Sequence, residues 1–351
     1  MLNSVYSKYL LHFKFPAGTS RGTLYDRETW LVKISDNNDS SIFGIGECGL
    51  FKGLSCDDRP DYEKKLGEFC RKIDGLELNC DEIVTWPSIR FGIETALLDF
   101  EQGGKRILFP SDFTNGTAGI PINGLIWMGS VDFMQKQIHD KIDAGFRCLK
   151  LKVGALDIDD ELEFIGSIRK QFSPQILEIR LDANGSFPRH NAMEILKRYA
   201  KYTIHSVEQP VKAGHPEFLS TLCKASPIPI ALDEELIGKN TLTEKRNLLK
   251  EVMPQYIVIK PSLTGGFSAS MEWITEAKAL NIGWWITSAL ESNIGLNAIA
   301  QWTYSLDVDM VQGLGTGGLY TNNISSPLFI KDQELHMDKN TNWDLPGIDF
   351  V

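Results

Sequence analysis

Residues 148–154, CLKLKVG, form a short strand-like apolar run that carries two lysines. Because side chains alternate across a strand, Lys150 and Lys152 point to the same face. At a separation of about 7 Å, two ammonium groups repel each other by roughly 2 kcal/mol at an effective dielectric of 20. Repulsion and burial both lower a lysine pKa, which makes such a lysine a usable general base near neutral pH.

Runs of the same kind recur from about residue 118 onward, and helix-like amphipathic segments separate them. They begin roughly 25 to 30 residues apart, the length of one strand, one crossover helix and two loops. The eight runs are GIPING (119–124), CLKLKV (148–153), LEIRLDA (177–183), IHSVEQ (204–209), PIALDE (229–234), YIVIKP (256–261), WWITSA (284–289) and VDMVQG (308–313). Eight βα units predict a closed barrel. A doubly wound sheet is the weaker alternative, since no edge strand stands out and no GxGxxG follows the first run.

The chain divides into three parts. Residues 1–115 contain alternating, strand-like segments at 29–36 and 41–49 and a helical pattern at 86–102, which predicts a separate α+β domain. Residues 116–325 hold the barrel units. Residues 326–351 carry no further unit, and we expect them to pack back on the first domain.

The composition of the chain limits the classes of molecule that it is expected to bind. A net charge of -10 and a pI near 5.2 argue against nucleic acid or an anionic membrane surface, so we expect a small molecule. The six cysteines are scattered without CxxC spacing and are expected to be reduced thiols. The N-terminus lacks signal-peptide features and no apolar run approaches membrane-spanning length, which predicts a cytoplasmic protein. The oligomeric state is left open.

Acidic residues stand where the third, fourth and fifth predicted strands end: Asp182, Glu208 and Asp233. They are 26 and 25 residues apart, one βα unit each time. Barrel sites lie at the carboxyl ends of the strands, so the three carboxylates are expected to converge. Each such contact costs roughly 4 kcal/mol at a dielectric of 20, and an all-oxygen ligand set suits Mg²⁺. Capping of the following helix is the alternative for each acid taken singly.

Lys260 ends the sixth predicted strand, across the barrel mouth from Lys150 and Lys152. A divalent metal flanked by lysines suits proton abstraction next to a carboxylate, in which the metal holds the enediolate and one lysine takes the proton. The alternative is that these lysines extend to the surface or pair with structural acids.

The motifs KLK (150–152), DAN (182–184), EQP (208–210), DE (233–234) and KPS (260–262) together resemble those of the enolase superfamily, muconate-lactonising branch, over nearly the whole chain. The resemblance implies an α/β fold, a modified TIM (β/α) barrel with an N-terminal α+β capping domain. Within the branch, TSALESNIGL (287–296) and GLGTGGLYTNN (313–323) are most similar to the o-succinylbenzoate synthase family of menaquinone biosynthesis. That family implies a lyase that dehydrates 2-succinyl-6-hydroxy-2,4-cyclohexadiene-1-carboxylate in a syn elimination via an enediolate.

The resemblance also implies residue roles. The Mg²⁺ ligands, with Mn²⁺ able to replace the ion, would be Asp182, Glu208 and Asp233. Lys152 would take the α-proton and return it to the departing hydroxide. Lys260 would stabilise the anion, and Lys150 would neutralise the bound carboxylate. The partner is then a small-molecule dicarboxylate.

Further residues are expected to bind the substrate. Arg180 shares a strand face with Asp182, although a structural salt bridge is equally consistent with its position. The glycine-rich run around Gly315 and Thr316 would offer N–H groups to the second carboxylate, with plain turn formation as the alternative. Ser288 is a candidate carboxylate donor. Loops 15–28 and 46–55 of the first domain are expected to close over the barrel mouth.

Two other functions compete with this one. A dipeptide epimerase or N-acylamino acid racemase would use the same scaffold, with Lys152 and Lys260 exchanging protons from opposite faces. The Asp-x-Asp pattern typical of dipeptide epimerases occurs as Asp307 and Asp309, but at the beginning of the eighth strand instead of its end. A non-catalytic ligand-binding barrel is the remote alternative.

Overall fold

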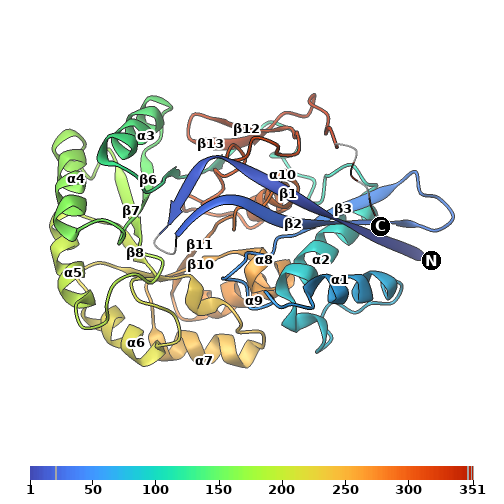
Figure 1. The fold of residues 1–351 in the computed structure, drawn as a ribbon, viewed down its shortest axis with the longest axis horizontal. Coiled ribbons are helices and arrows are strands. Elements are labelled where there is room, and N and C mark those ends of the chain that lie inside the picture. Colours follow the sequence, from blue (N-terminus) through green and yellow to red (C-terminus); the bar gives the residue numbers. More distant parts are fainter. Residues whose placement is uncertain (20–21, 346–347, 349, 351) are drawn as a thin grey trace.

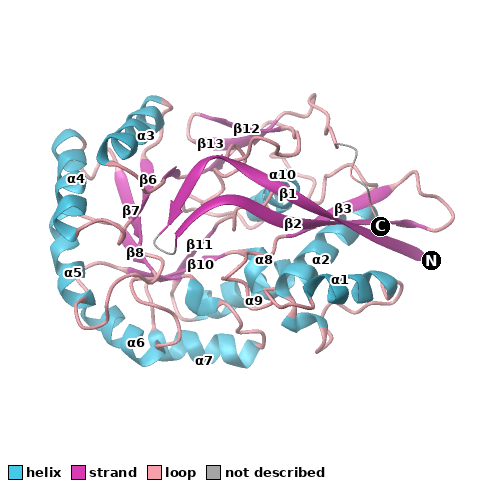
Figure 2. Ribbon diagram, in the orientation of Figure 1, coloured by secondary structure: helices cyan, strands magenta, loops and turns pink. Residues whose placement is uncertain are grey.

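The computed structural model describes residues 1–19, 22–345, 348 and 350. An antiparallel sheet with two helices lies beside a curved ring of alternating strands and helices (Figures 1 and 2). The long hairpin of the first sheet extends over the ring (Figure 1), and Gly18 near its end forms a β-bridge with Met128 of the ring. The predicted lid loop 15–28 includes residues 20 and 21, which lie outside the described residues.

The first sheet has the order β1 (Leu2–Thr19), β2 (Gly22–Asp36) and β3 (Phe43–Cys48). Two helices, α1 (Tyr62–Arg71) and α2 (Pro87–Glu101), pack on it around buried apolar side chains. Helix α2 lies directly against β3, where a Cβ atom on Gly46 would stand 1.9 Å from the carbonyl oxygen of Gly92. The glycines of the GIGE run therefore allow a closer helix–strand approach than any side chain would permit.

The second sheet is parallel and has the order β11-β10-β9-β8-β7-β6-β5. Its strands are β5 (Gly124–Ile126), β6 (Cys148–Lys152), β7 (Glu178–Asp182), β8 (Ser206–Glu208), β9 (Ile230–Leu232), β10 (Tyr256–Ile259) and β11 (Gly283–Ile286). The helices that follow them are α3 (Val131–Asp143), α4 (Ile158–Gln171), α5 (Ala192–Tyr199), α6 (Pro216–Ala225), α7 (Leu242–Val252), α8 (Pro261–Thr264) with α9 (Gly266–Ala279), and α10 (Asn293–Tyr304). The predicted alternation of strands and helices is therefore confirmed.

Strand alternation places the charged residues inside the barrel. Leu149 and Leu151 of β6, and Leu181 of β7, belong to the large apolar core shared with the helices. The residues between them, Lys150 and Lys152, face the opposite way, toward the barrel interior. The alternation of side chains along β6 therefore places the two lysines inside the barrel and the two leucines in the core outside it.

Two predicted strands differ from the expectation. The first run splits, because β4 (Ile120–Pro121) pairs antiparallel with a C-terminal strand and only β5 joins the parallel sheet. The eighth run contributes single bridges, from Gln312 to Ile122 and from Gly313 to Thr287. Asp307, directly before this run, has a positive φ of 51°, in the left-handed region. The barrel is closed by bridges instead of by a full eighth strand.

The C-terminal residues contact both parts of the molecule. The hairpin β12 (Leu328–Lys331) and β13 (Glu334–Met337) joins β4. Further on, Trp343 and Leu345 pack with Leu31 and Ile45 of the first sheet.

Two carboxylates of the first domain, the buried Glu47 and the half-buried Glu94, bind to the barrel. Glu47 accepts hydrogen bonds from the backbone N–H groups of Ser292 and Gly295, each at 2.9 Å, at the N-terminus of α10. Glu94 on α2 accepts from the N–H of Phe267 at 2.6 Å, at the N-terminus of α9. A carboxylate at a helix N-terminus satisfies N–H groups that lack an intrahelical partner. Two side chains of the first domain thus cap two helices of the barrel.

Among the described residues, no helix is long and apolar enough to cross a membrane.

Candidate active site

Three lysines and three carboxylates meet inside the barrel. Lys152 Nζ lies 2.7 Å from Asp182 Oδ2, and Lys150 Nζ lies 2.9 Å from the same oxygen. Lys150 also contacts Glu208 at 2.7 Å, and Lys260 is bonded to Asp233. The groups predicted to share one site do lie together.

Strand register explains this convergence. Lys152 stands opposite Asp182 on the neighbouring strand, and Asp182 stands opposite Glu208 on the next one. Asp233 follows β9, and its backbone N–H donates to Gln209 Oε1 at 3.1 Å. Lys260 follows β10, four strands away from β6 in the sheet order. Lys152 and Lys260 therefore approach from different sides of the interior.

The three lysines have different electrostatic surroundings. Burial lowers the pKa of Lys152; Asp182 opposes this effect, and the ammonium groups of Lys150 and Lys260 reinforce it. Burial also disfavours the charge of Lys150, but Asp182 and Glu208 outweigh it and raise its pKa. The pKa of Lys260 is likewise raised, because Asp233 and Glu208 outweigh burial. Lys152 is thus the member of the trio whose proton is held least tightly.

The carboxylates are all buried and are also unlike one another. Burial and the neighbouring Asp182 raise the pKa of Glu208 to about 8. Burial acts in the same direction on Asp182, but Lys150 and Lys152 outweigh it and lower its pKa. Burial would also raise the pKa of Asp233, but Lys260 outweighs this effect and lowers that pKa.

The donor set fits a hard divalent cation. Three carboxylates from successive strands supply only oxygen, which is the ligand type that Mg²⁺ takes in proteins. Lys150 bonds both Asp182 and Glu208, so these two carboxylates already accommodate positive charge between them. Among the described residues, no group of three or more histidine, cysteine, aspartate or glutamate side chains is arranged so that it could hold a metal ion as it stands. Metal binding by this trio remains a prediction.

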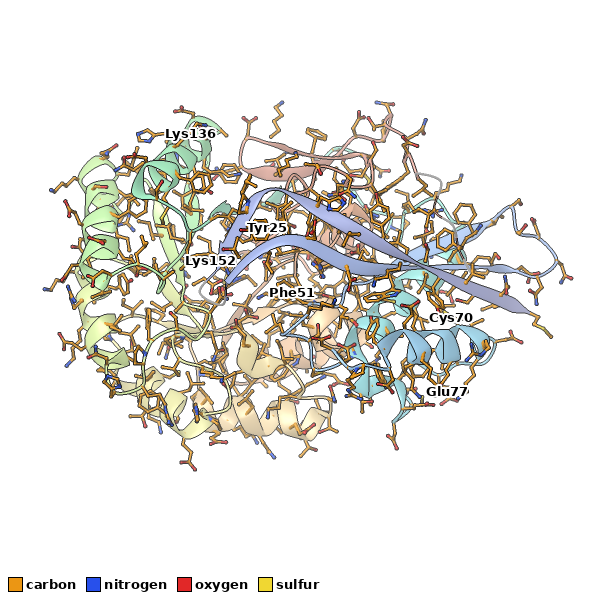
Figure 3. All side chains as sticks on the ribbon, viewed as in Figure 1. Tyr25, Phe51, Cys70, Glu77, Lys136 and Lys152 are labelled. Atoms are coloured by element: carbon orange, nitrogen blue, oxygen red, sulfur yellow. The ribbon has the colours of Figure 1, made fainter. Side chains whose placement is uncertain are left out.

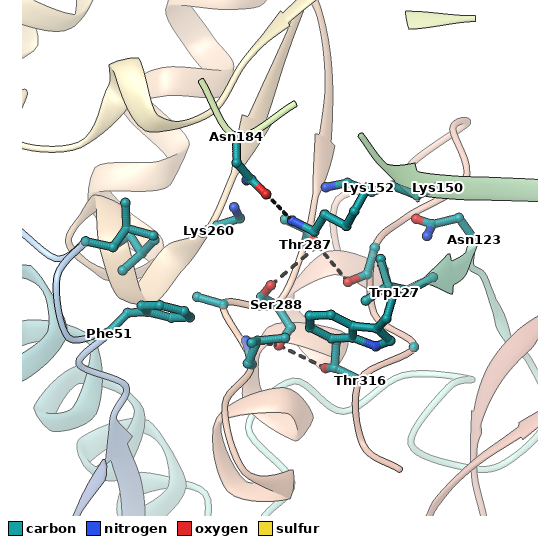
Figure 4. A pocket seen from close by; sticks show the side chains of 17 residues that line it. Phe51, Asn123, Trp127, Lys150, Lys152, Asn184, Lys260, Thr287, Ser288 and Thr316 are labelled. Carbon is teal, nitrogen blue, oxygen red and sulfur yellow. Dashed lines mark hydrogen bonds between the residues drawn. The ribbon is translucent and has the colours of Figure 1, made fainter. Parts of the chain in front are cut away.

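A pocket opens above this cluster and encloses about 680 Å³ of empty space, part of it open to solvent. Figure 4 shows the three lysines on one side of it, with Phe51 and Trp127 on opposite sides beneath them. In the view of Figure 3, Phe51 and Lys152 both appear next to the ribbon of the long hairpin. The described wall residues include three lysines and no acidic side chain, so the pocket is suited to an anion. They are Phe51, Leu54, Asn123, Leu125, Trp127, Lys150, Lys152, Asn184, Lys260, Leu263, Thr287, Ser288, Ala289, Leu290, Gly313, Gly315 and Thr316.

Ser288, Gly315 and Thr316 line this pocket, but the two hydroxyl groups are not free donors. Thr316 donates to Ser288 Oγ at 2.9 Å, and Ser288 donates to Glu291 at 2.6 Å. Each hydroxyl has one proton to give, so Ser288 would have to release Glu291 in order to donate to a substrate carboxylate, and its role in binding stays a prediction. Glu291 also accepts from Ser262 Oγ at 2.5 Å.

Arg180, also expected to bind the substrate, is not among the described residues that line the pocket. Its guanidinium bonds Glu178 at 2.7 Å and the Val311 carbonyl at 2.9 Å, and it lies 4.7 Å from the ring centroid of Trp285. These partners lie toward the opposite end of the barrel, away from the pocket. Two residues separate Arg180 from Asp182, so the same strand face carries it one layer deeper. The alternative of a structural salt bridge is the one observed.

Several pocket residues were not predicted. Asn184, whose Oδ1 accepts from Lys152 at 2.7 Å, belongs to the quoted DAN motif and was overlooked there. Trp127 directly follows β5, and an aromatic residue at a strand end was an available signal. Phe51 lies in the predicted lid loop, but only the fold shows that this position of the loop reaches the lysines.

The fold and this cluster together define an enolase-type barrel enzyme, and the sequence comparison agrees. Residues 134–344 match the family model described as Enolase C-terminal domain-like, and the chain belongs to the enolase superfamily.

Among individual relatives, the o-succinylbenzoate synthase of Desulfotalea psychrophila is 44% identical over 93% of this chain and 96% of its own length. The L-Ala-D/L-Glu epimerase of Bacillus subtilis is 25% identical over 83% of this chain and 81% of its own length. The crystal structure of MenC from Desulfotalea psychrophila superposes with a TM-score of 0.85 at 40% identity, covering 96% of this chain and 99% of that one. A dipeptide epimerase from Enterococcus faecalis, complexed with Mg and L-Leu-L-Tyr, shares the fold with a TM-score of 0.82 at 20% identity, covering 96% of each chain.

Proposed function

We propose that this protein is an o-succinylbenzoate synthase, a lyase that dehydrates 2-succinyl-6-hydroxy-2,4-cyclohexadiene-1-carboxylate to 2-succinylbenzoate. The charge of the pocket carries the proposal, since its described wall has three lysines and no acid. This wall complements a substrate with two carboxylates and no cation. The high identity to a synthase along most of the chain supports the same conclusion.

Lys152 acts as the base. It removes the proton from the ring carbon that bears the carboxylate, and the electron pair forms an enediolate. The pair then returns to form the new ring double bond while the hydroxide leaves, taking its proton from the Lys152 ammonium as water. Asn184 and Asp182 each hold Lys152 Nζ at 2.7 Å, which fixes its position for both transfers. The lowered pKa of Lys152 suits a base that must accept and release one proton.

Lys260 keeps its proton, because its raised pKa favours the ammonium form, and contributes positive charge to the anion. Lys150 holds Asp182 and Glu208 together and adds charge beneath the bound carboxylate. Asp182, Glu208 and Asp233 would hold Mg²⁺, or Mn²⁺ in its place. When bound, the ion would supply charge that stabilises the enediolate oxygens.

The second carboxylate of the substrate is assigned to the backbone N–H groups of Gly315 and Thr316 in the pocket wall. The ring would lie between Phe51 and Trp127, two flat apolar surfaces that also limit water. A role in menaquinone biosynthesis and a cytoplasmic location belong to the same proposal.

Epimerisation or racemisation is the second candidate, because Lys152 and Lys260 face the same pocket from two strands four apart. Asp307 and Asp309 precede the bridged residue Gln312 and do not line the pocket, so they are not placed to bind a substrate ammonium.

The test is turnover of the cyclohexadiene substrate by the purified protein with Mg²⁺, with EDTA, and with Mg²⁺ restored. We expect 2-succinylbenzoate to form only where the ion is present. Parallel incubations in D₂O with an N-acylamino acid and with a dipeptide report α-proton exchange. Exchange without any dehydration at saturating Mg²⁺ would replace the proposal with the second candidate, and the absence of both reactions would leave a ligand-binding barrel.

A further inference from the structure

Arg27, on strand β2 of the first domain, is 7% exposed and contacts both domains at the rim of the pocket. We propose that Arg27 is a positioning residue, whose guanidinium holds the segment 49–51 of the first domain against the barrel segment 288–291 and thereby sets the width of the pocket. The kinetic consequence rests on the proposed function, whereas the contacts themselves do not.

The guanidinium bonds three backbone carbonyls on two separate segments. It donates to Gly49 at 2.9 Å and to Leu50 at 3.4 Å on one side. On the other side it donates to the Ala289 carbonyl. A planar group with several fixed donors can join two segments in one geometry, which the flexible point charge of a lysine cannot do.

The barrel segment needs such support because its backbone is strained. Leu290 has a φ of 66°, in the left-handed region that a branched residue rarely adopts. Its N–H donates to Ser288 Oγ at 2.9 Å, and its carbonyl accepts from Tyr320 at 2.6 Å. The third restraint is the bond from Arg27 to the carbonyl of Ala289, the residue before Leu290. Of the three bonds, this one connects the segment to the β1–β2–β3 sheet.

The segment of the first domain is also positioned by Arg27. The Phe51 ring centroid lies 5.4 Å from the guanidinium carbon. Phe51 also lines a second cavity, together with Leu10, Leu24 and Arg27 itself. Phe51 thus borders two cavities and is half-buried, so the cation beside its ring contributes to its position.

These contacts place Arg27 beside two segments of the pocket wall, Phe51 of the first domain and residues 289–290 of the barrel. None of these three bonds involves a catalytic lysine or a carboxylate of the proposed metal site. Loss of the Arg27 side chain should therefore weaken binding of the substrate ring and leave the residues that transfer the proton in place.

The test compares Arg27→Met with Arg27→Lys and with a matched control, Arg169→Met. Arg169 on α4 also donates to three backbone carbonyls, those of Tyr202, Leu177 and Thr203, but in the helix layer away from the pocket. Steady-state kinetics give KM and kcat separately, thermal unfolding gives stability, and hydrogen–deuterium exchange reports on segments 49–54 and 287–291 without substrate.

For Arg27→Met we expect KM to rise about tenfold with kcat within about threefold of wild type, and faster exchange in both segments. Arg27→Lys should recover part of the KM, and Arg169→Met should lose stability while keeping both KM and the exchange pattern. Should Arg27→Met fail to fold, Arg27→Lys carries the same comparison. Wild-type KM and exchange in the Arg27 variants would overturn the inference. Faster exchange in a protein whose wild type performs no dehydration would refute the proposed function while supporting the positioning role.

Discussion

Lys150 and Lys152 lie two residues apart in one strand, yet their replacement should affect stability in opposite directions. The perturbation is a single methionine at either position, which keeps the length of the side chain and removes the charge. Both variants are compared with wild type in EDTA at pH 7, so that only the groups of the chain itself contribute.

Lys152→Met should leave the free energy of unfolding unchanged or raise it. The pKa of Lys152 is lowered in the folded protein, first by burial and then by Lys150 and Lys260. The unfolded chain therefore binds the proton more tightly, and stability linked to this group falls as the pH drops through the folded pKa. Asp182 keeps a partner after the change, since Lys150 remains 2.9 Å away.

Lys150→Met should destabilise the fold by about 3–5 kcal/mol, the cost of removing one partner from a buried ion pair. Lys150 is bonded to Asp182 and Glu208, and both carboxylates would lose a cation in a buried site. Its raised pKa shows that the charged form is favoured there.

Urea denaturation followed by tryptophan fluorescence measures both effects, and turnover provides the second readout. Lys152→Met should lose at least about 10⁴ in kcat, roughly 5.5 kcal/mol, because one residue serves as base and then as acid. A Lys152 variant as unstable as the Lys150 variant would refute the electrostatic reasoning. Residual turnover within tenfold of wild type would refute the assignment of the base.

Three further outcomes are expected. Asp233→Asn should shift the Mg²⁺ titration midpoint of activity upward by about tenfold or more, because one ligand charge is lost; an unchanged midpoint would remove Asp233 from the ligand set. Gly46→Ala should lower the unfolding free energy by about 1–3 kcal/mol or more, since the new methyl group would meet the Gly92 carbonyl; a thermal midpoint equal to wild type would contradict the packing described for β3. Burial raises the pKa of Asp57 to about 6, so its stabilising contribution is complete below the unfolded pKa near 4 and is lost as the pH rises through 6, about 3 kcal/mol in all. Asp57→Asn should flatten that part of the pH–stability curve in denaturant titrations, and a curve identical to wild type would exclude this group as its cause.

The sequence predicted those features that depend on local periodicity. Lys152, Asp182 and Glu208 could be placed together because each ends a strand and parallel strands end at one edge. Alternation alone does not report depth along a strand, so Arg180 was assigned to the pocket although it lies one layer lower. The eighth strand was predicted from an apolar run, but such a run does not show whether its backbone pairs along its length, and this one forms isolated bridges at Gln312 and Gly313.

Contacts between segments far apart in the chain could not be predicted from the sequence, for a different reason. Phe51, Arg27 and Leu290 come from two domains, and only their packing brings them to one rim. The bond from Ser288 to Glu291 could not be predicted either, because it depends on how the two side chains are placed in the folded loop.

The contacts of Glu47 and Glu94 determine whether the two domains can be separated or exchanged. Each supplies the missing acceptor of a barrel helix from outside the barrel, so a fragment that begins after residue 115 would leave α9 and α10 without those acceptors. We expect calorimetry of the whole chain to show one cooperative transition. A successful exchange of the first domain with that of a relative would have to carry both glutamates at matching positions.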